Sequence, residues 1–175
     1  AFDQPLGSGT GAAVIFGATG GVMEAALRTA VYMITGEDAP SVDFTEVRGV
    51  EGIKEATYEI DGVGPVKVAV ASGLANARDL LKKVRSGEAD YQFIEIMGCP
   101  GGCVNGGGQP VQPARAERAK VLYNLDAKNL LRKSYENPDI QELYKNYLGE
   151  PGSEKAHHLL HTTYVKRTVN RVYGK

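Results

Sequence analysis

Residues 66–97, VKVAVASGLANARDLLKKVRSGEADYQFIEIM, decide the fold class of this chain. The apolar run at 66–71 predicts a strand, residues 74–85 a helix, and residues 91–97 a second strand, with Gly87 ending the helix. A strand, a helix and a strand within about 30 residues form a βαβ unit, whose two strands run parallel. The sequence therefore predicts an α/β fold with a mostly parallel sheet and flanking helices. The helix is expected to bury one stripe, formed by Leu74, Ala77, Leu81 and Val84.

Upstream of this unit, residues 54–60 alternate between apolar and polar side chains, which is typical of a half-buried strand. The turn signals that follow predict that this strand forms a hairpin with 66–71. Residues 22–34 predict a helix that is buried on most sides, with Glu24 and Arg28 paired at i,i+4. The apolar run at 12–16 fits either a buried strand or the first turn of a buried helix.

Downstream of Pro110 the pattern becomes helical. Helices are expected from about 114 to 123, with an extension toward 132, from 138 to about 148, and after Ser153 through His161. Pro113 suits the first turn of the first of these helices. We therefore expect three parts: an α/β domain over 1–112, a helical extension over 113–165 and a basic tail over 166–175.

The charge balance excludes several classes of partner. The chain has 175 residues, with 20 basic and 21 acidic side chains. Such a balance gives no field that attracts nucleic acid or anionic lipid, and no apolar run approaches the ~20 residues of a membrane helix. The first residues lack a charged-then-apolar leader, and we expect a cytoplasmic protein of which this chain is a fragment or a processed piece.

Glycine is the unusual component, with 22 residues, or about 13% against a usual ~7%. Residues 7–21 hold six glycines and residues 98–108 hold six more, so the excess is confined to two short segments. If 12–16 is a strand, both segments lie at carboxyl ends of strands, where open α/β sheets bind ligands. The two glycine segments are then expected to face one site.

Cys99 and Cys103 are the two cysteines of the chain, and they lie within the second glycine segment. Thiolates are soft ligands that suit iron–sulfur clusters and zinc, and glycine N–H groups can donate to cluster sulfides. The alternative is a turn with two buried, inert thiols. A [4Fe–4S] cluster or a tetrahedral zinc site takes four ligands, so this pair is half a site. His157, His158 and His161 are the candidates that could complete a zinc site.

Two glycine patterns also permit a nucleotide-binding interpretation. Residues 7–12 match G-x-G-x-x-A, but this motif requires a preceding strand. Residues 17–21, Gly-Ala-Thr-Gly-Gly, could bind a pyrophosphate at a helix N-terminus. The remaining interpretation of this segment is close packing of its backbone against a neighbouring strand.

The residues resemble a specific family at three places. Residues 93–110, FIEIMGCPGGCVNGGGQP, resemble the third H-cluster signature of [FeFe]-hydrogenases. Residues 11–28, GAAVIFGATGGVMEAALR, resemble the glycine-rich segment of that family beside the cluster, and residues 124–161 resemble its small-subunit-like helical extension. The resemblance implies half of the iron-only hydrogenase large-domain fold and reversible reduction of protons to H₂.

The resemblance also implies roles for individual residues. The family's H-cluster is a [4Fe–4S] cube joined through one cysteine sulfur to a two-iron unit with CO, cyanide and a dithiolate. By the match, Cys103 is the bridging ligand and Cys99 a terminal ligand of the cube. Met97 packs near the two-iron unit and Phe16 lines its gas-binding side. The backbone of the glycine segment lies close to the cyanide and CO ligands, through Gly17, Ala18, Thr19 and Gly20.

Two family signatures are absent from this chain, and with them two cube cysteines and the proton-delivering cysteine. The resemblance therefore implies that the missing half of the domain is a partner, that this fragment alone is inactive, and that it self-associates. An electron-carrier protein or NAD(P)H-linked subunits are the implied redox partners. The alternatives are a non-catalytic iron–sulfur assembly relative or a sensory relative of the family.

Overall fold

The computed structural model of the chain describes residues 7, 9–110 and 114–166. The chain forms two compact units, residues 1–137 and 138–175. The expected helix start at Pro113 and most of the expected basic tail lie outside the described residues. The α/β class is confirmed, with one small sheet and several helices.

The sheet of the first unit has the order β1-β2-β3. Strand β1 spans Ile53–Ile60, β2 spans Gly64–Ser72 and β3 spans Phe93–Met97. β1 and β2 pair antiparallel, which confirms the hairpin, and β2 and β3 pair parallel, which confirms the βαβ unit. The sheet is therefore mixed, with one antiparallel and one parallel pair among the described residues. Helix α3, Leu74–Ser86, connects the parallel strands.

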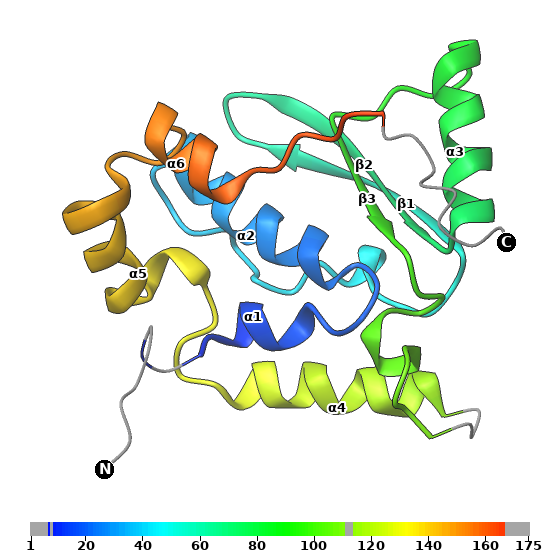
Figure 1. Ribbon diagram of the computed structural model, residues 1–175, viewed down its shortest axis with the longest axis horizontal. Coiled ribbons are helices and arrows are strands. Elements are labelled where there is room, and N and C mark those ends of the chain that lie inside the picture. Colours follow the sequence, from blue (N-terminus) through cyan, green and yellow to red (C-terminus); the bar gives the residue numbers. More distant parts are fainter. Residues whose placement is uncertain (1–6, 8, 111–113, 167–175) are drawn as a thin grey trace, which may run out of the picture. The chain divides into compact units, whose positions relative to one another are not determined.

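The second half of strand β2, residues 68–72, is buried because helices cover both faces of the sheet there (Figure 1). Val68 and Val70 pack into a core with Met23 and Leu27 of helix α2, which spans Gly21–Thr35. The residues that alternate with these valines are small. Ala69 and Ala71 pack on the other face of the sheet, against Ala77 and Leu80 of α3. A strand covered on both faces has a continuous apolar sequence, as at 68–71.

The expected apolar stripe of α3 is correct at Ala77, which is buried, but wrong at Leu74 and Leu81. Leu74 is 74% exposed and Leu81 is 37% exposed, whereas Leu80 is fully buried. The alanines of β2 leave room for the helix to approach closely, and Ala77 with Leu80 fills that space. Leu80 and Leu81 are adjacent in sequence, so the local pattern did not decide which of them faces the sheet.

Residues 12–16 form a helix and not a strand. Helix α1 spans Gly11–Ile15, and the hydroxyl of Thr10 caps it by accepting from the amide of Ala13 at 3.1 Å. Helix α4, Arg115–Lys128, packs against α1 and belongs to the same compact unit (Figure 1). A Cβ on Gly11 would lie 2.1 Å from Oδ1 of Asp126 on α4, so glycine is needed at this crossing.

Helix α2 carries the charged centre of the first unit. The guanidinium of Arg28 donates to Glu24 at 2.8 Å and to both carboxylate oxygens of Asp126 at 2.9 and 2.8 Å. It also donates to the carbonyls of Val42 and Arg132. The side chains of Arg28, Glu24 and Asp126 are fully buried. Arg28 thus ties α2 to α4 and to two loops, and the expected i,i+4 pair is part of this network.

The second unit contains the remaining helices. Helix α5 spans Pro138–Leu143 and continues as a π-helical turn over Tyr144–Leu148. Helix α6 spans Glu154–Leu160, and the hydroxyl of Ser153 caps it by accepting from the amide of Ala156. Both helices confirm the sequence prediction for this region, including its cap.

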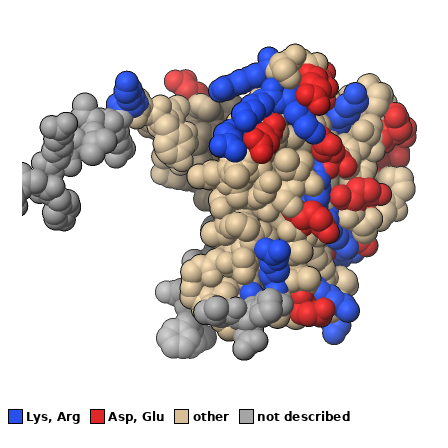
Figure 2. Space-filling view, turned by 90° about the vertical axis from the view of Figure 1, so that its right-hand side faces the viewer, with Lys and Arg blue, Asp and Glu red and all other residues tan. Residues whose placement is uncertain are grey.

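The surface agrees with the balanced composition. Figure 2 shows acidic and basic side chains interspersed over the face of the molecule that it draws. In the described part of the chain, none of the helices combines the length and the apolarity needed to cross a membrane.

Arg28→Met tests the buried charge network. The change leaves two buried carboxylates without their central partner, and breaking a buried pair in this way costs about 3–5 kcal/mol. Denaturant unfolding of the chain should show a loss of this size. The matched control is Arg78→Met, since Arg78 is an exposed partner of Asp79 on α3 and exposed pairs contribute about 0–1 kcal/mol. Equal losses in the two variants would contradict the network's role.

Candidate functional site

The cysteine loop, residues 98–108, begins directly after the carboxyl end of β3. Cys99 and Cys103 are both free and exposed, so the alternative of buried, inert thiols is wrong. The amide of Gly102 donates to the carbonyl of Cys99 at 2.9 Å, and the amide of Gly106 donates to that of Cys103 at 3.0 Å. Two consecutive turns therefore present both thiols to the surface.

The first glycine segment lies directly against the cysteine loop. The amide of Thr19 donates to the carbonyl of Gly101 at 3.2 Å, and the amide of Val104 donates to the carbonyl of Gly17 at 3.0 Å. A Cβ on Gly102 would lie 2.7 Å from both the carbonyl oxygen of Gly17 and the amide nitrogen of Thr19. Gly102 also has a φ of +99°, which favours glycine. The two glycine segments therefore lie side by side, although 12–16 is not the strand on which this prediction depended, and their service to one binding site stays a prediction.

The structure separates the residues of the glycine segment into two groups. Phe16 is 45% exposed and Gly17 is partly exposed, while Ala18, Thr19 and Gly20 are buried. The amides of the buried three donate within the chain, to Ile15, Gly101 and Glu95 respectively. Met97, at the end of β3, is partly exposed. The roles assigned to these residues toward a cofactor stay predictions.

Two charged residues that the sequence analysis did not select hold the turn at 19–20. The carboxylate of Glu95, on β3, accepts from the amides of Gly20 at 2.8 Å and Met23 at 2.7 Å. The ammonium of Lys54, on β1, donates to the carbonyls of Thr19 at 3.0 Å and Gly49 at 2.7 Å. Burial lowers the pKa of Lys54 to about 8, against the opposing effect of the carboxylates nearby. A charged residue in the centre of the apolar strand FIEIM was the signal that could have identified Glu95.

Helix α4 packs against the cysteine loop and donates a hydrogen bond to it. Val104 packs with Ala18 and with Ala119 of α4 in a small apolar cluster. The guanidinium of Arg118, also on α4, donates to the carbonyl of Val104 at 2.5 Å. The loop is thus fixed on one side by the glycine segment and on the other by a helix.

The nucleotide-binding interpretation of 17–21 is wrong. The segment follows a helix and not a strand, so the strand–loop–helix context of a phosphate-binding loop is missing. The N-terminus of α2, where a pyrophosphate would bind, already receives the carboxylate of Glu95. The G-x-G-x-x-A match at 7–12 depends on residues 1–6, which lie outside the described residues.

The three candidate histidines lie in the second unit, where His157 and His158 are on α6 and His161 ends it. The Nδ1 atoms of His157 and His161 are 2.7 Å apart, and both rings are exposed. His157 and His161 thus contact each other. The use of the three histidines as zinc ligands with the cysteines stays a prediction.

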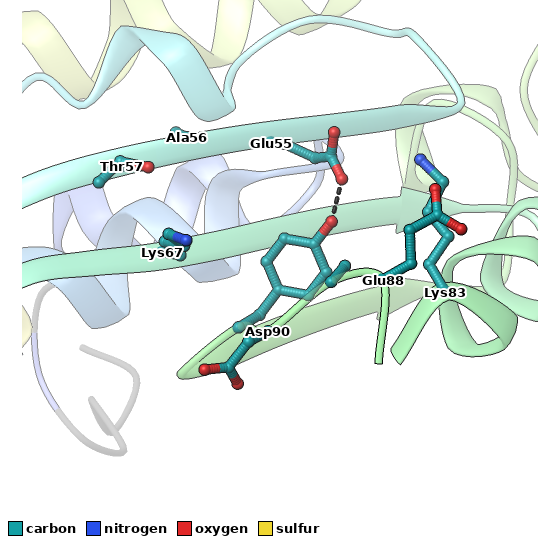
Figure 3. A pocket seen from close by; sticks show the side chains of 9 residues that line it. Glu55, Ala56, Thr57, Lys67, Lys83, Glu88 and Asp90 are labelled. Atoms are coloured by element: carbon teal, nitrogen blue, oxygen red, sulfur yellow. Dashed lines mark hydrogen bonds between the residues drawn. The ribbon is translucent and has the colours of Figure 1, made fainter. Parts of the chain in front are cut away.

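The first unit has a polar surface pocket of about 460 Å³, which Figure 3 draws from close by. Its lining includes Glu55, Lys67 and Lys83, together with the loop that leads into β3. The hydroxyl of Tyr91 donates to the carboxylate of Glu55 across it. None of the predicted site residues lines this pocket, since they gather near the opposite end of β3.

The donor set of the cysteine loop fits part of an iron–sulfur site. Two exposed thiols stand on turns built from glycine, and a Cβ on Gly106 would lie 3.6 Å from Sγ of Cys99. The chain contains two cysteines, whereas a [4Fe–4S] cube normally takes four. The residues present therefore suit half of the ligand set of such a cube.

Comparison with known proteins identifies the family. The family model described as iron only hydrogenase large subunit, C-terminal domain, matches residues 1–107. The chain belongs to the iron-only hydrogenase family. A second model, iron hydrogenase small subunit, matches residues 112–167. The chain is 54% identical to the NADP-reducing hydrogenase subunit HndD of Solidesulfovibrio fructosivorans, over 95% of this chain and 29% of that protein.

Solved structures give the same result. A variant of the [FeFe]-hydrogenase HydA1 from Chlamydomonas reinhardtii is 46% identical and matches with a TM-score of 0.70, over 94% of this chain and 49% of that one. The family also has relatives outside hydrogenases: the cytosolic iron-sulfur assembly component 3 of Rattus norvegicus is 34% identical over 85% of this chain and 31% of that protein. The chain thus spans about three-tenths of these curated relatives and about half of the solved chain.

Gly102→Ala tests the close approach of the two loops. The added methyl group meets backbone atoms and requires an unfavourable φ, so the inter-loop hydrogen bonds should weaken. Hydrogen exchange at the amides of Thr19 and Val104 should accelerate about tenfold or more. The control is Gly107→Ala, because a Cβ there meets no described atom within 4 Å. Unchanged exchange in Gly102→Ala would contradict the proposed contact.

Proposed function

We propose that the chain is the C-terminal part of the catalytic domain of an [FeFe]-hydrogenase and supplies two thiolate ligands of its H-cluster. One observation carries this proposal: Cys99 and Cys103 are exposed on consecutive turns that the first glycine segment, residues 7–21, holds in place through backbone hydrogen bonds. The identity of 54% to a hydrogenase subunit, against 34% to an assembly component, supports the catalytic branch. Residues 106–110, Gly-Gly-Gly-Gln-Pro, resemble the hydrogenase form of the loop.

Each predicted site residue has a role in this proposal. Cys103 bridges the cube and the two-iron unit, and Cys99 is a terminal ligand of the cube. Phe16, Val22 and Met97 form an apolar wall beside the two-iron unit and limit its contact with water, which tunes its potential. Gly17 lies with Phe16 on the gas-binding side. When bound, the H-cluster supplies the redox chemistry that interconverts protons and electrons with H₂.

The buried residues of the glycine segment act through the loop that they support. Ala18 packs against Val104, the amide of Thr19 bonds the segment to the cysteine loop at Gly101, and the amide of Gly20 bonds it to Glu95 of β3. The proton-delivering group and the other two cube ligands belong to the part of the domain that this chain does not include. The isolated chain is therefore inactive in this proposal.

Several exposed apolar side chains support the proposal that the remaining part of the same domain packs against this chain. Phe16, Phe93 and Ile96 are 44–45% exposed, and Leu74 is 74% exposed. Within the described residues, β3 pairs on one side alone, with β2. The remaining part of the domain would cover these residues. The name of the relative HndD, an NADP-reducing hydrogenase subunit, favours NAD(P)H-linked subunits or an electron carrier as redox partners.

Cys103→Ser in the full-length protein tests the bridging role. Serine removes the soft ligand that joins the two parts of the cluster, so H₂ production should fall by at least a hundredfold. Arg78→Met, on the exposed side of α3 and outside the cysteine loop, is the control and should retain activity. Gas chromatography of H₂ with a reduced electron donor measures the change. Unchanged turnover in Cys103→Ser would refute the bridging assignment.

A cluster that forms without turnover would favour the assembly or sensory alternative. In that case the wild-type full-length protein binds iron and acid-labile sulfide but neither produces nor consumes H₂.

Self-association of the isolated chain tests the missing-half proposal. Exposed apolar surface that another part of the domain normally covers drives association in water. Light scattering should show species larger than 18.7 kDa, and co-expression with the rest of the domain should convert them into one complex. A monomer at high concentration would contradict the proposal.

A further inference from the structure

The peptide group between Thr19 and Gly20 is held at both of its polar atoms by charged side chains. Its carbonyl oxygen, on Thr19, accepts from Nζ of Lys54 at 3.0 Å, and its N–H, on Gly20, donates to the carboxylate of Glu95 at 2.8 Å. The two charged residues come from different strands, β1 and β3. Together they fix the direction of one peptide plane, since a reversed plane would turn its carbonyl toward Glu95.

Both charged side chains are buried, and hydrogen bonds must compensate for the loss of their contact with water. Lys54 is 8% exposed and Glu95 is 7% exposed, and burial of a charge is costly unless hydrogen bonds compensate for it. Glu95 is compensated by two amides at the N-terminus of α2, where the helix dipole favours a negative charge. Gly20, the N-cap of α2, has no side chain and a φ of +89°, so the capping carboxylate comes from 75 residues away.

The residues next to this peptide group make the contacts with the cysteine loop. The amide of Thr19 donates to Gly101, and the carbonyl of Gly17 accepts from Val104. Glu95 itself lies four residues before Cys99 on the same strand-to-loop segment. The strand that carries the cysteines therefore also sets the position of the turn against which they rest.

We propose that Glu95 and Lys54 are positioning residues for the cysteine loop: by fixing the Thr19–Gly20 peptide group, they set the place of Cys103 relative to Phe16 and Gly17. The effect of these two residues on a cluster rests on the proposed function. Their effect on the position of the cysteine loop concerns this chain alone. Glu95 and Lys54 act through the backbone and touch no reacting atom.

Glu95→Gln in the full-length protein tests this inference. Glutamine has the same size but one acceptor oxygen, so its amide group opposes one of the two N–H groups at α2. Hydrogen exchange should accelerate about tenfold at Gly20 and Met23, and also at Thr19 and Val104, while amides of the β1–β2 ladder keep their rates. Faster exchange at Gly20 and Met23 with unchanged exchange at Thr19 and Val104 would overturn the inference.

Two further variants separate positioning from general stability. Lys54→Met should accelerate exchange at Val104 as Glu95→Gln does, because it releases the other end of the same peptide group. Glu59→Gln, an exposed carboxylate change on β1, should leave these rates unchanged. A uniform increase of exchange over the whole first unit in Lys54→Met and Glu95→Gln would show a structural role alone and overturn the inference.

A spectroscopic measurement extends the test to the cluster. In the loaded full-length protein, Glu95→Gln should shift the reduction potential of the cluster or its CO and cyanide vibrations relative to wild type, with iron content unchanged. Loaded protein with unshifted signals would overturn the link to the cluster. If the wild-type protein binds no iron at Cys99 and Cys103, the proposed function fails, and the exchange rates still decide whether the peptide group is fixed.

Discussion

The approach of two backbone segments at Gly102 is the constraint on which the site depends. Gly102 lies so close to Gly17 and Thr19 that a single Cβ would meet backbone atoms at 2.7 Å. Backbone atoms cannot move aside as a flexible side chain can, so glycine is required here. The contact brings the cysteine loop after β3 and the turn before α2 to one place, although more than 80 residues separate them in the sequence. The glycine excess of the chain is therefore partly a consequence of this single crossing.

Two sets of buried charges support the crossing, one at the N-terminus of α2 and one at its middle. At its N-terminus, Glu95 and Lys54 hold the turn. Further along the helix, Arg28 ties α2 to Asp126 of α4, the helix that also carries the loop at Val104. Burial acts to raise the pKa of Asp126, but hydrogen bonds from Arg28 and Arg132 outweigh it and keep the pKa below its usual range. This part of the stability is thus present above the usual aspartate pKa and is lost as the pH falls through the lowered value.

The sequence was sufficient for features that depend on local pattern. The hairpin, the βαβ unit and the end of α3 at Gly87 follow from alternation and from glycine at positive φ. The phase of α3 did not, because Leu80 and Leu81 are equivalent until the alanines of β2 select one. Glu95 and Lys54 were missed because a strand pattern assigns charged residues to solvent, and only the tertiary contact supplies their partners. The cysteine pair was recognised because its chemistry is local.

Iron-edge anomalous diffraction from crystals of the loaded full-length protein tests directly whether Cys99 and Cys103 hold the cluster. We expect iron atoms bonded to Sγ of both Cys99 and Cys103, with the sulfur of Cys103 in contact with two separate iron groups and the Thr19–Gly20 turn in its present place. Iron density without a bond to either thiol, or with Cys103 bound to one iron group alone, would contradict it.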